Sequence, residues 1–203
     1  YGTPHMDHAE FDQRILRALD AIAGVAEHTP VMSSAALASH CGGPVALKAE
    51  NLQRTGSFKL RGALSKLAEL GPAAANGVTA GSAGNHAQAL AFAARHHGVP
   101  CEIFVPAGAS ISKVEACRSY GASVIRGGDS LDDAVMSARD RAASAGLAFC
   151  HPYDDPAVVA GQATLGLELL ADLPDLRRVI VPLGGGGLAS GIALAVKRAN
   201  PGI

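Results

Sequence analysis

The sequence lacks the features of membrane, secreted and nucleic-acid-binding proteins. Its 17 basic and 18 acidic residues give a formal net charge of −1, which offers no attraction to nucleic acid or to an anionic membrane. No apolar run approaches the length of a membrane span, and no basic segment precedes an apolar one as in a signal peptide. We therefore expect no nucleic-acid partner and no membrane.

Cysteine is scarce, and its spacing fits neither a zinc site nor a disulfide scaffold. The four cysteines are scattered, and none are spaced as paired zinc ligands; they are Cys41, Cys101, Cys117 and Cys150. Disulfide scaffolds are short and dense in cysteine, so reduced thiols in a cytoplasmic protein are the simplest interpretation. We expect a cytoplasmic location and no metal site.

Aromatic residues are also few, at 4%, whereas glycine is abundant, with 24 residues. Hydrophobic residues make up 48% of the 203 positions, which is enough for one large domain or two small ones with a real core. Short apolar runs flanked by glycine suit a layered α/β protein. The opening YGTPHM is typical of a cloning remnant, and we expect the native sequence to begin near Met6.

The hydrophobic pattern alternates between strands and helices along the whole chain. Such alternation predicts right-handed crossovers and parallel sheets with helices on both faces. The closing KRANPGI ends a helix and begins what looks like another strand, so we expect a final strand and its helix to be missing. Strands are predicted at 44–50, 77–82, 100–106, 122–128, 147–152 and 177–183, and helices at 10–26, 57–71, 85–98, 112–121, 130–146, 156–173 and 188–200.

The segment VPLGGGGLASG, residues 181–191, is the strongest local signal for a ligand. An apolar run ends, four glycines follow and a helix begins, so backbone N–H groups and the helix N-terminus can face a phosphate. A tight turn is the structural alternative. No GK[ST] follows, which excludes a Walker A loop. Gly184, Gly186 and Ala189 match a dinucleotide fingerprint only formally, since its acidic residue would fall beyond the sequence.

A second loop, GSAGNHAQ at residues 81–88, leads from a strand into a helix. Its backbone N–H groups, the Ser82 hydroxyl and the Asn85 amide could bind a carboxylate. The alternatives are that Ser82 or Asn85 simply caps the helix, and that His86 is a packed core histidine.

Lys59 is the third candidate, in TGSFKLRGA at residues 55–63. A lysine amine is nucleophilic only when its pKa is lowered by burial or nearby charge, or when it is held as an imine. A solvated helix lysine is the alternative. Lysine, phosphate cradle and carboxylate loop are together the parts that a pyridoxal-phosphate enzyme needs to act on an amino acid.

The sequence resembles the fold-type-II pyridoxal-phosphate enzymes, specifically threonine ammonia-lyases and related serine dehydratases and racemases. The segments that carry the resemblance span most of the chain; they are KAENLQRTGSFKLRGA (48–63), GSAGNHAQALAFAARHHGVP (81–100), HPYDDPAVVAGQATLGLELL (151–170) and VPLGGGGLASGIA (181–193). The resemblance implies a two-domain, tryptophan synthase β-like α/β fold. Residues 75–148 would form a small mobile domain, and 7–74 with 149–203 an incomplete large domain.

The resemblance also implies a role for each matching position. Lys59 would form the imine with the cofactor, Phe58 would flank its ring, and Asn85 would hydrogen-bond its 3-hydroxyl. The substrate carboxylate would bind to the loop of Ser82, Ala83, Gly84, Asn85 and His86. The phosphate would bind to the backbone of Gly184, Gly185, Gly186, Gly187 and Leu188.

The implied reaction is β-elimination of L-threonine, L-serine or both, to 2-oxobutanoate or pyruvate and ammonia, in a homo-oligomer. Racemases of this family resemble SSGNH at the substrate loop, whereas this chain has Ala83, which cannot exchange a proton. Elimination is therefore favoured over serine racemisation, the nearest alternative. A cofactor-free, non-catalytic fragment and a nucleotide-binding protein remain further alternatives. We expect the chain as given to bind the cofactor poorly and to have little activity.

Overall fold

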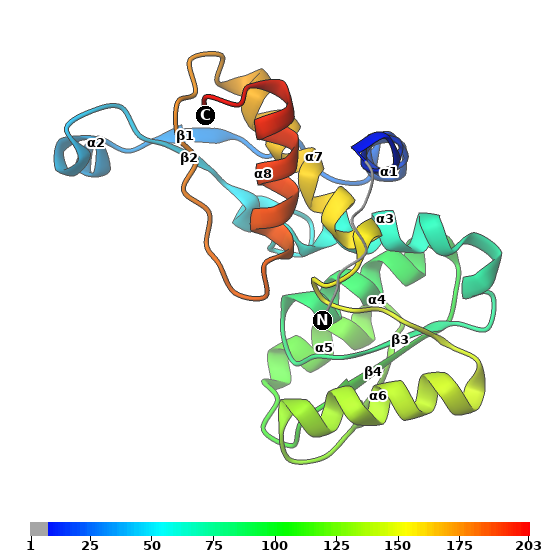
Figure 1. The fold of residues 1–203 in the computed structure, drawn as a ribbon. Helices are drawn as coiled ribbons and strands as arrows, with labels where there is room; N and C mark the ends of the chain where they lie inside the picture. Colours follow the sequence, from blue (N-terminus) through cyan, green and yellow to red (C-terminus); the bar gives the residue numbers. More distant parts are fainter. Residues whose placement is uncertain (1–7) are drawn as a thin grey trace.

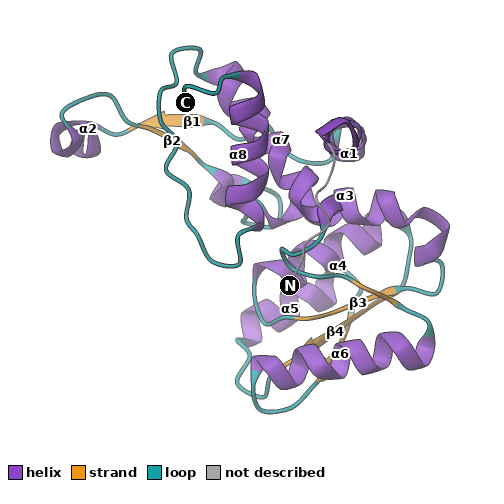
Figure 2. Ribbon diagram, in the orientation of Figure 1, coloured by secondary structure: helices purple, strands orange, loops and turns teal. Residues whose placement is uncertain are grey.

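The computed structural model describes residues 8–203 (Figure 1). Residues 1–7, which include the expected cloning remnant, lie outside the described part. Two groups of elements are visible: a layered sheet with helices on both sides, and a group of helices with a small two-stranded arm (Figure 2). Within residues 8–203 no helix is both long and apolar enough to cross a bilayer.

The main sheet has four parallel strands in the order β5-β4-β3-β6. Helices α4 (Asn85–His97) and α5 (Ile111–Ser119) cover one face, and α6 (Leu131–Ala145) covers the other (Figure 1). This confirms the predicted parallel sheet with helices on both faces. The strands are β3 (Val78–Gly81), β4 (Cys101–Val105), β5 (Ser123–Arg126) and β6 (Ala148–Phe149).

The second group packs four helices together, α1 (His8–Ile22), α3 (Lys59–Leu70), α7 (Pro156–Asp172) and α8 (Gly187–Ala199). The helix predicted at 10–26 is confirmed, and one face of it is apolar: Phe11, Ile15 and Ile22 are buried, and Leu19 is half-buried. Leu60, Leu64 and Leu67 of α3 are buried in the main core beneath α4. Helix α3 therefore contacts both groups, and the short helix η2 (Gly71–Ala74) leads from it to β3.

A small arm was only partly predicted. The strand expected at 44–50 is reduced to β2 (Ala46–Lys48), and it pairs antiparallel with β1 (Val31–Ser33). Helix α2 (Ala35–Cys41) connects the two strands and has no buried residue. The parallel pairing expected for this strand is therefore wrong, because the chain returns directly beside β1. The short helix η1 (Glu50–Leu52) follows β2.

The strand predicted at 177–183 is absent. Val179 and Val181 are half-buried, whereas Ile180 and Leu183 are 88% and 75% exposed. The side chains alternate as in a strand only over residues 179–181, because Leu183 should share the side of Val179 and Val181 but is exposed. Within residues 8–203 no neighbouring strand pairs with this backbone. A strand needs such a partner for its N–H and C=O groups, so the apolar pattern alone did not produce one.

Candidate active site

Lys59 is placed by a tight turn and by the start of α3. The Gly56 N–H donates to the Gln53 carbonyl at 2.6 Å, and Gly56 has φ +73°, a conformation that favours glycine. Helix α3 begins at Lys59 without a side-chain cap. The turn before it also buries the hydroxyls of Thr55 and Ser57, which have no hydrogen-bond partner among residues 8–203.

The Lys59 amine faces the interior. Its Nζ donates to the Pro152 carbonyl at 2.6 Å and lies 5.4 Å from the centroid of the Phe58 ring. Burial lowers the pKa of Lys59, and no carboxylate in the described part of the chain forms an ion pair with it. The side chain is therefore half-buried and hydrogen-bonded to the protein rather than solvated, and its pKa moves in the direction that a nucleophilic amine needs.

The loop at the start of α4 has no side-chain cap. Gly84 occupies the cap position, while the Ser82 hydroxyl accepts the Gly84 N–H at 3.2 Å. Asn85 is exposed and Ala83 is half-buried. The alternative that Ser82 or Asn85 caps the helix is thus wrong, and the first turn of α4 keeps N–H groups that can bind an anion.

His86 is a buried side chain rather than an exposed ligand. Its Nε2 lies 3.0 Å from the Cys150 carbonyl, which requires a proton on Nε2. Burial, together with the charges of Lys59 and His151, lowers the pKa of His86 to about 4, although the hydrogen bond opposes the shift. His86 is therefore neutral at pH 7 and ties the α4 loop to the segment after β6.

The glycine loop lies against Tyr153. A Cβ on Gly185 would lie 2.3 Å from the Tyr153 ring, and one on Gly187 would lie 2.8 Å from the Tyr153 carbonyl oxygen. Gly186 has φ +90° at the cap position of α8, and no side chain caps this helix. Leu188 is half-buried against α7 and α8, and Gly184 is exposed. The N-terminus of α8 can therefore receive an anion.

One short segment, residues 150–153, joins the three candidate motifs. The Cys150 carbonyl accepts from His86, the Pro152 carbonyl accepts from Lys59, and Tyr153 contacts the glycine loop. The strand expected at 147–152 ends at Phe149, so these carbonyls are available for the contacts. The sequence analysis did not predict that residues 150–153 connect the three motifs, although HPYDDP spans the junction between a predicted strand and a predicted helix.

Stability should depend on pH through His86. Its pKa is about 4 in the folded protein and near 6.5 when unfolded, so the unfolded chain binds more protons between these values. Acidification from pH 7 to 4.5 should therefore remove roughly 2 to 3 kcal/mol from the free energy of unfolding through this group alone. Urea unfolding at the two pH values measures the loss.

The matched control is His86→Gln, which can still donate to the Cys150 carbonyl but does not titrate. Its pH dependence should be shallower, with a remaining slope from His97 and His151, whose pKa values are also lowered by burial. An equal pH dependence in both proteins would contradict the assignment.

Residues 22–203 match the family described as pyridoxal-phosphate dependent enzymes. An L-threonine ammonia-lyase of Thermotoga maritima is 46% identical over 188 residues, covering 92% of this chain and 47% of that protein. A catabolic L-threonine dehydratase, TdcB, of Escherichia coli K12 is 45% identical over 190 residues, which cover 93% of this chain and 58% of that protein. The chain thus spans about half the length of the curated relatives it matches.

Solved structures agree with the described fold. Maize serine racemase superimposes with a TM-score of 0.90 at 38% identity, covering 94% of this chain and 58% of that one. The processed form of threonine deaminase isoform 2 from Solanum lycopersicum gives a TM-score of 0.90 at 34% identity. The match covers 97% of this chain and 55% of that one. The fold-type-II architecture expected from the sequence is thereby confirmed.

Proposed function

Because this chain belongs to the family of pyridoxal-phosphate dependent enzymes, we propose that the whole protein deaminates L-threonine, and L-serine, by β-elimination. The observation that carries the proposal is the position of Lys59. Its half-buried amine, with a lowered pKa, contacts the residue next to Tyr153, on which the glycine loop rests. An amine and an anion site side by side suit an aldehyde cofactor with a phosphate.

The residues present fit this cofactor. The uncapped α8 N-terminus offers positive charge to a phosphate, and Gly185 and Gly187 let the loop pack closely against Tyr153, where an added Cβ would collide. The partnerless hydroxyls of Thr55 and Ser57 suit a site that a polar molecule completes. We assign phosphate binding to Gly184, Gly185, Gly186, Gly187 and Leu188, the aldehyde carbon to Lys59, the ring to Phe58, and the 3-hydroxyl to Asn85.

When bound, pyridoxal phosphate supplies a conjugated system that stabilises the charge left on the substrate Cα after proton loss. Lys59 Nζ would hold the cofactor through its aldehyde until the substrate amine takes its place. As a free amine it would be the base that removes the Cα proton, and burial, which lowers its pKa, favours the unprotonated form that this role requires. The Cα proton and the β-hydroxyl would be lost together as one water, and uptake of one water would then give ammonia and 2-oxobutanoate, or pyruvate.

The substrate loop would orient the amino acid. In this assignment the carboxylate binds to the loop of Ser82, Ala83, Gly84, Asn85 and His86, and the buried His86 side chain fixes the loop. The N–H groups of Ser82 and Gly84 already donate within the protein, at 2.9 Å to the Phe104 carbonyl and at 3.2 Å to the Ser82 hydroxyl, so the other three residues supply the backbone N–H groups. Ala83 has no group that could return a proton to the opposite face of Cα. This supports elimination over racemisation, although a serine racemase is among the similar structures.

The function is tested by incubating the whole protein with pyridoxal phosphate and L-threonine. We expect 2-oxobutanoate and ammonia in equal amounts, and pyruvate from L-serine. Chiral analysis of the remaining serine is the accompanying measurement. Absence of any oxo acid would refute the lyase assignment, and substantial D-serine would favour a racemase instead.

The proposal includes the domain division, with residues 75–148 as a small mobile domain and 7–74 with 149–203 as parts of a large one. It also includes a cytoplasmic homo-oligomer. Exposed apolar side chains on the arm support an assembly interface; they are Met32, Leu37 and Leu47. Sedimentation of the whole protein tests the assembly, and a monomer at micromolar concentration would exclude it.

A further inference from the structure

Arg61, two residues after Lys59, is completely buried, with 0% exposure. Its guanidinium forms two bidentate pairs. Nε and Nη2 donate to the Glu50 carboxylate at 2.9 and 2.8 Å, and Nη1 and Nη2 donate to the Glu168 carboxylate at 2.6 and 3.0 Å. Nη1 also reaches the Thr164 hydroxyl at 3.3 Å, and Nη2 the Glu27 carbonyl at 3.2 Å. Such planar, paired contacts fix orientation strongly.

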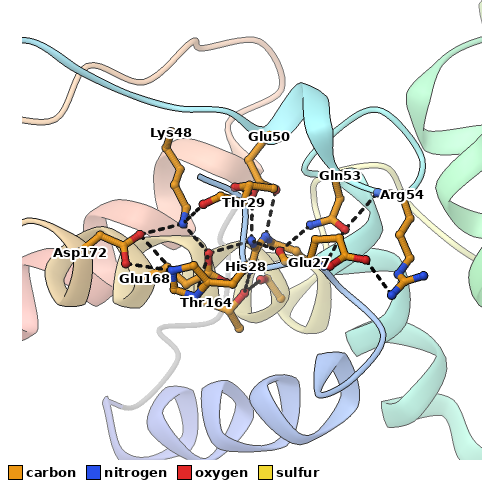
Figure 3. A network of polar contacts seen from close by, with 12 residues as sticks. Glu27, His28, Thr29, Lys48, Glu50, Gln53, Arg54, Thr164, Glu168 and Asp172 are labelled. Atoms are coloured by element: carbon orange, nitrogen blue, oxygen red, sulfur yellow. Dashed lines mark hydrogen bonds and ion pairs between the residues drawn. The ribbon is translucent and has the colours of Figure 1, made fainter. Parts of the chain in front are cut away.

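The two carboxylates are themselves held from several elements, as Figure 3 shows. The Thr29 hydroxyl donates to Glu50 at 2.6 Å. Lys48 Nζ lies 2.7 Å from Glu168 and 2.9 Å from Asp172, and donates to the Thr29 carbonyl at 2.7 Å. The first turn of α3 is therefore joined through Arg61 to η1, to α7 and, one contact further, to β2.

Stabilising a core with buried ion pairs requires a large desolvation free energy. Removing a guanidinium and carboxylates from water costs several kcal/mol per ion, and apolar side chains of similar volume often stabilise as well or better. Although burial alone would raise it, hydrogen bonds from Arg61 and Lys48 hold the pKa of Glu168 below its usual value. Glu168 thus keeps its negative charge although it is partly buried. This indicates that the network serves to fix the orientation of the side chains rather than to stabilise the fold.

Helical geometry shows what Arg61 can orient. Residues two positions apart in an α-helix leave it about 200° apart, so Lys59 and Arg61 lie on opposite sides of one turn. Lys59 meets Pro152 on its side, and Arg61 meets Glu50 and Glu168 on the other. No side chain caps α3, and the Arg61 pairs hold this turn to η1 and α7 on the side away from Lys59.

We propose that Arg61 is a positioning residue for Lys59: its two carboxylate pairs fix the rotation of the first turn of α3 and so aim the Lys59 amine at residues 152–153 and the glycine loop. The inference rests on the proposed function, in which Lys59 holds the cofactor. Arg61 itself touches neither cofactor nor substrate.

The test compares Arg61→Met and Arg61→Lys with the unchanged whole protein. Two readouts are used: the rate of appearance of the imine absorbance on adding pyridoxal phosphate, and competitive acetylation of Lys59 without cofactor, followed by mass spectrometry across pH. Per folded molecule, Arg61→Met should slow imine formation and lower kcat by about 10- to 100-fold, since a displacement near 1 Å has such effects. KM for threonine should change little, and Arg61→Lys should recover part of the rate.

The matched control is Arg141→Lys. Arg141 also forms a bidentate pair, with Glu102 at 2.8 and 2.9 Å, but on the surface of the sheet domain. The Arg141→Lys variant should leave the rate of imine formation and the acetylation of Lys59 unchanged. If Arg61→Met does not fold, Glu168→Gln keeps the shape of a partner and removes its charge, and the same slowing is expected.

A folded Arg61→Met or Glu168→Gln protein with unchanged imine rate and unchanged Lys59 acetylation would overturn the inference, whatever its thermal stability. If the unchanged protein forms no imine with pyridoxal phosphate, the proposed function fails instead. The acetylation of Lys59 then still decides whether Arg61 positions it.

Discussion

Replacing Lys59 by alanine in the whole protein is expected to abolish both the imine absorbance with pyridoxal phosphate and the deamination of threonine. Alanine cannot bind the cofactor aldehyde and cannot remove the Cα proton. Loss of the base alone should lower kcat by about 10²- to 10⁴-fold. Because Lys59 makes its contact through one carbonyl, Pro152, the variant should remain folded. Absorbance titration and an oxo-acid assay measure the two losses.

Lys197→Ala is the matched control for this experiment. Lys197 is exposed near the end of α8 and also donates to a proline carbonyl, that of Pro201, at 3.0 Å. It should retain the absorbance and the activity. An imine band that persists in Lys59→Ala and disappears in Lys197→Ala would mean that the nucleophile had been assigned to the wrong lysine.

Replacing Gly161 by alanine is expected to destabilise the protein and to displace the Lys59 turn. At an open helical position this change would stabilise by up to about 1 kcal/mol. Here the added Cβ would lie 2.5 Å from the Arg61 carbonyl oxygen and 2.6 Å from Gly62 Cα, so the backbones of α3 and α7 must separate. We expect a net loss of about 1 to 3 kcal/mol in the free energy of unfolding, measured by urea denaturation.

Gly43→Ala is its control, because Gly43 has no atom within 4 Å of an added Cβ and no positive φ. It should change stability by no more than about 0.5 kcal/mol. The folded fraction of Gly161→Ala should also form the imine more slowly. An unchanged or higher stability would show that α3 and α7 can separate without cost.

Regular elements with local signals were predictable. The apolar stripes of α1 and α3 and the alternation from β3 to β6 follow periodicities within one element, and the structure confirms them. The strand expected at 177–183 and the pairing of β1 with β2 were not predictable, because a strand depends on a neighbour elsewhere in the chain. A period of two indicates which side chains share a face, but not whether a partner strand exists.

The sequence by itself determined the chemical parts: one lysine at a helix start, a polar loop before α4 and four glycines at the start of α8. It also determined the family resemblance, since these parts depend on residue type and local backbone freedom. Only the tertiary structure decided that Lys59 is half-buried, that residues 150–153 join the three parts, and that Arg61 lies in an ion network rather than in water. The physical reason is that burial and charge pairing depend on residues far apart in the sequence; Arg61 and Glu168, for example, are 107 positions apart.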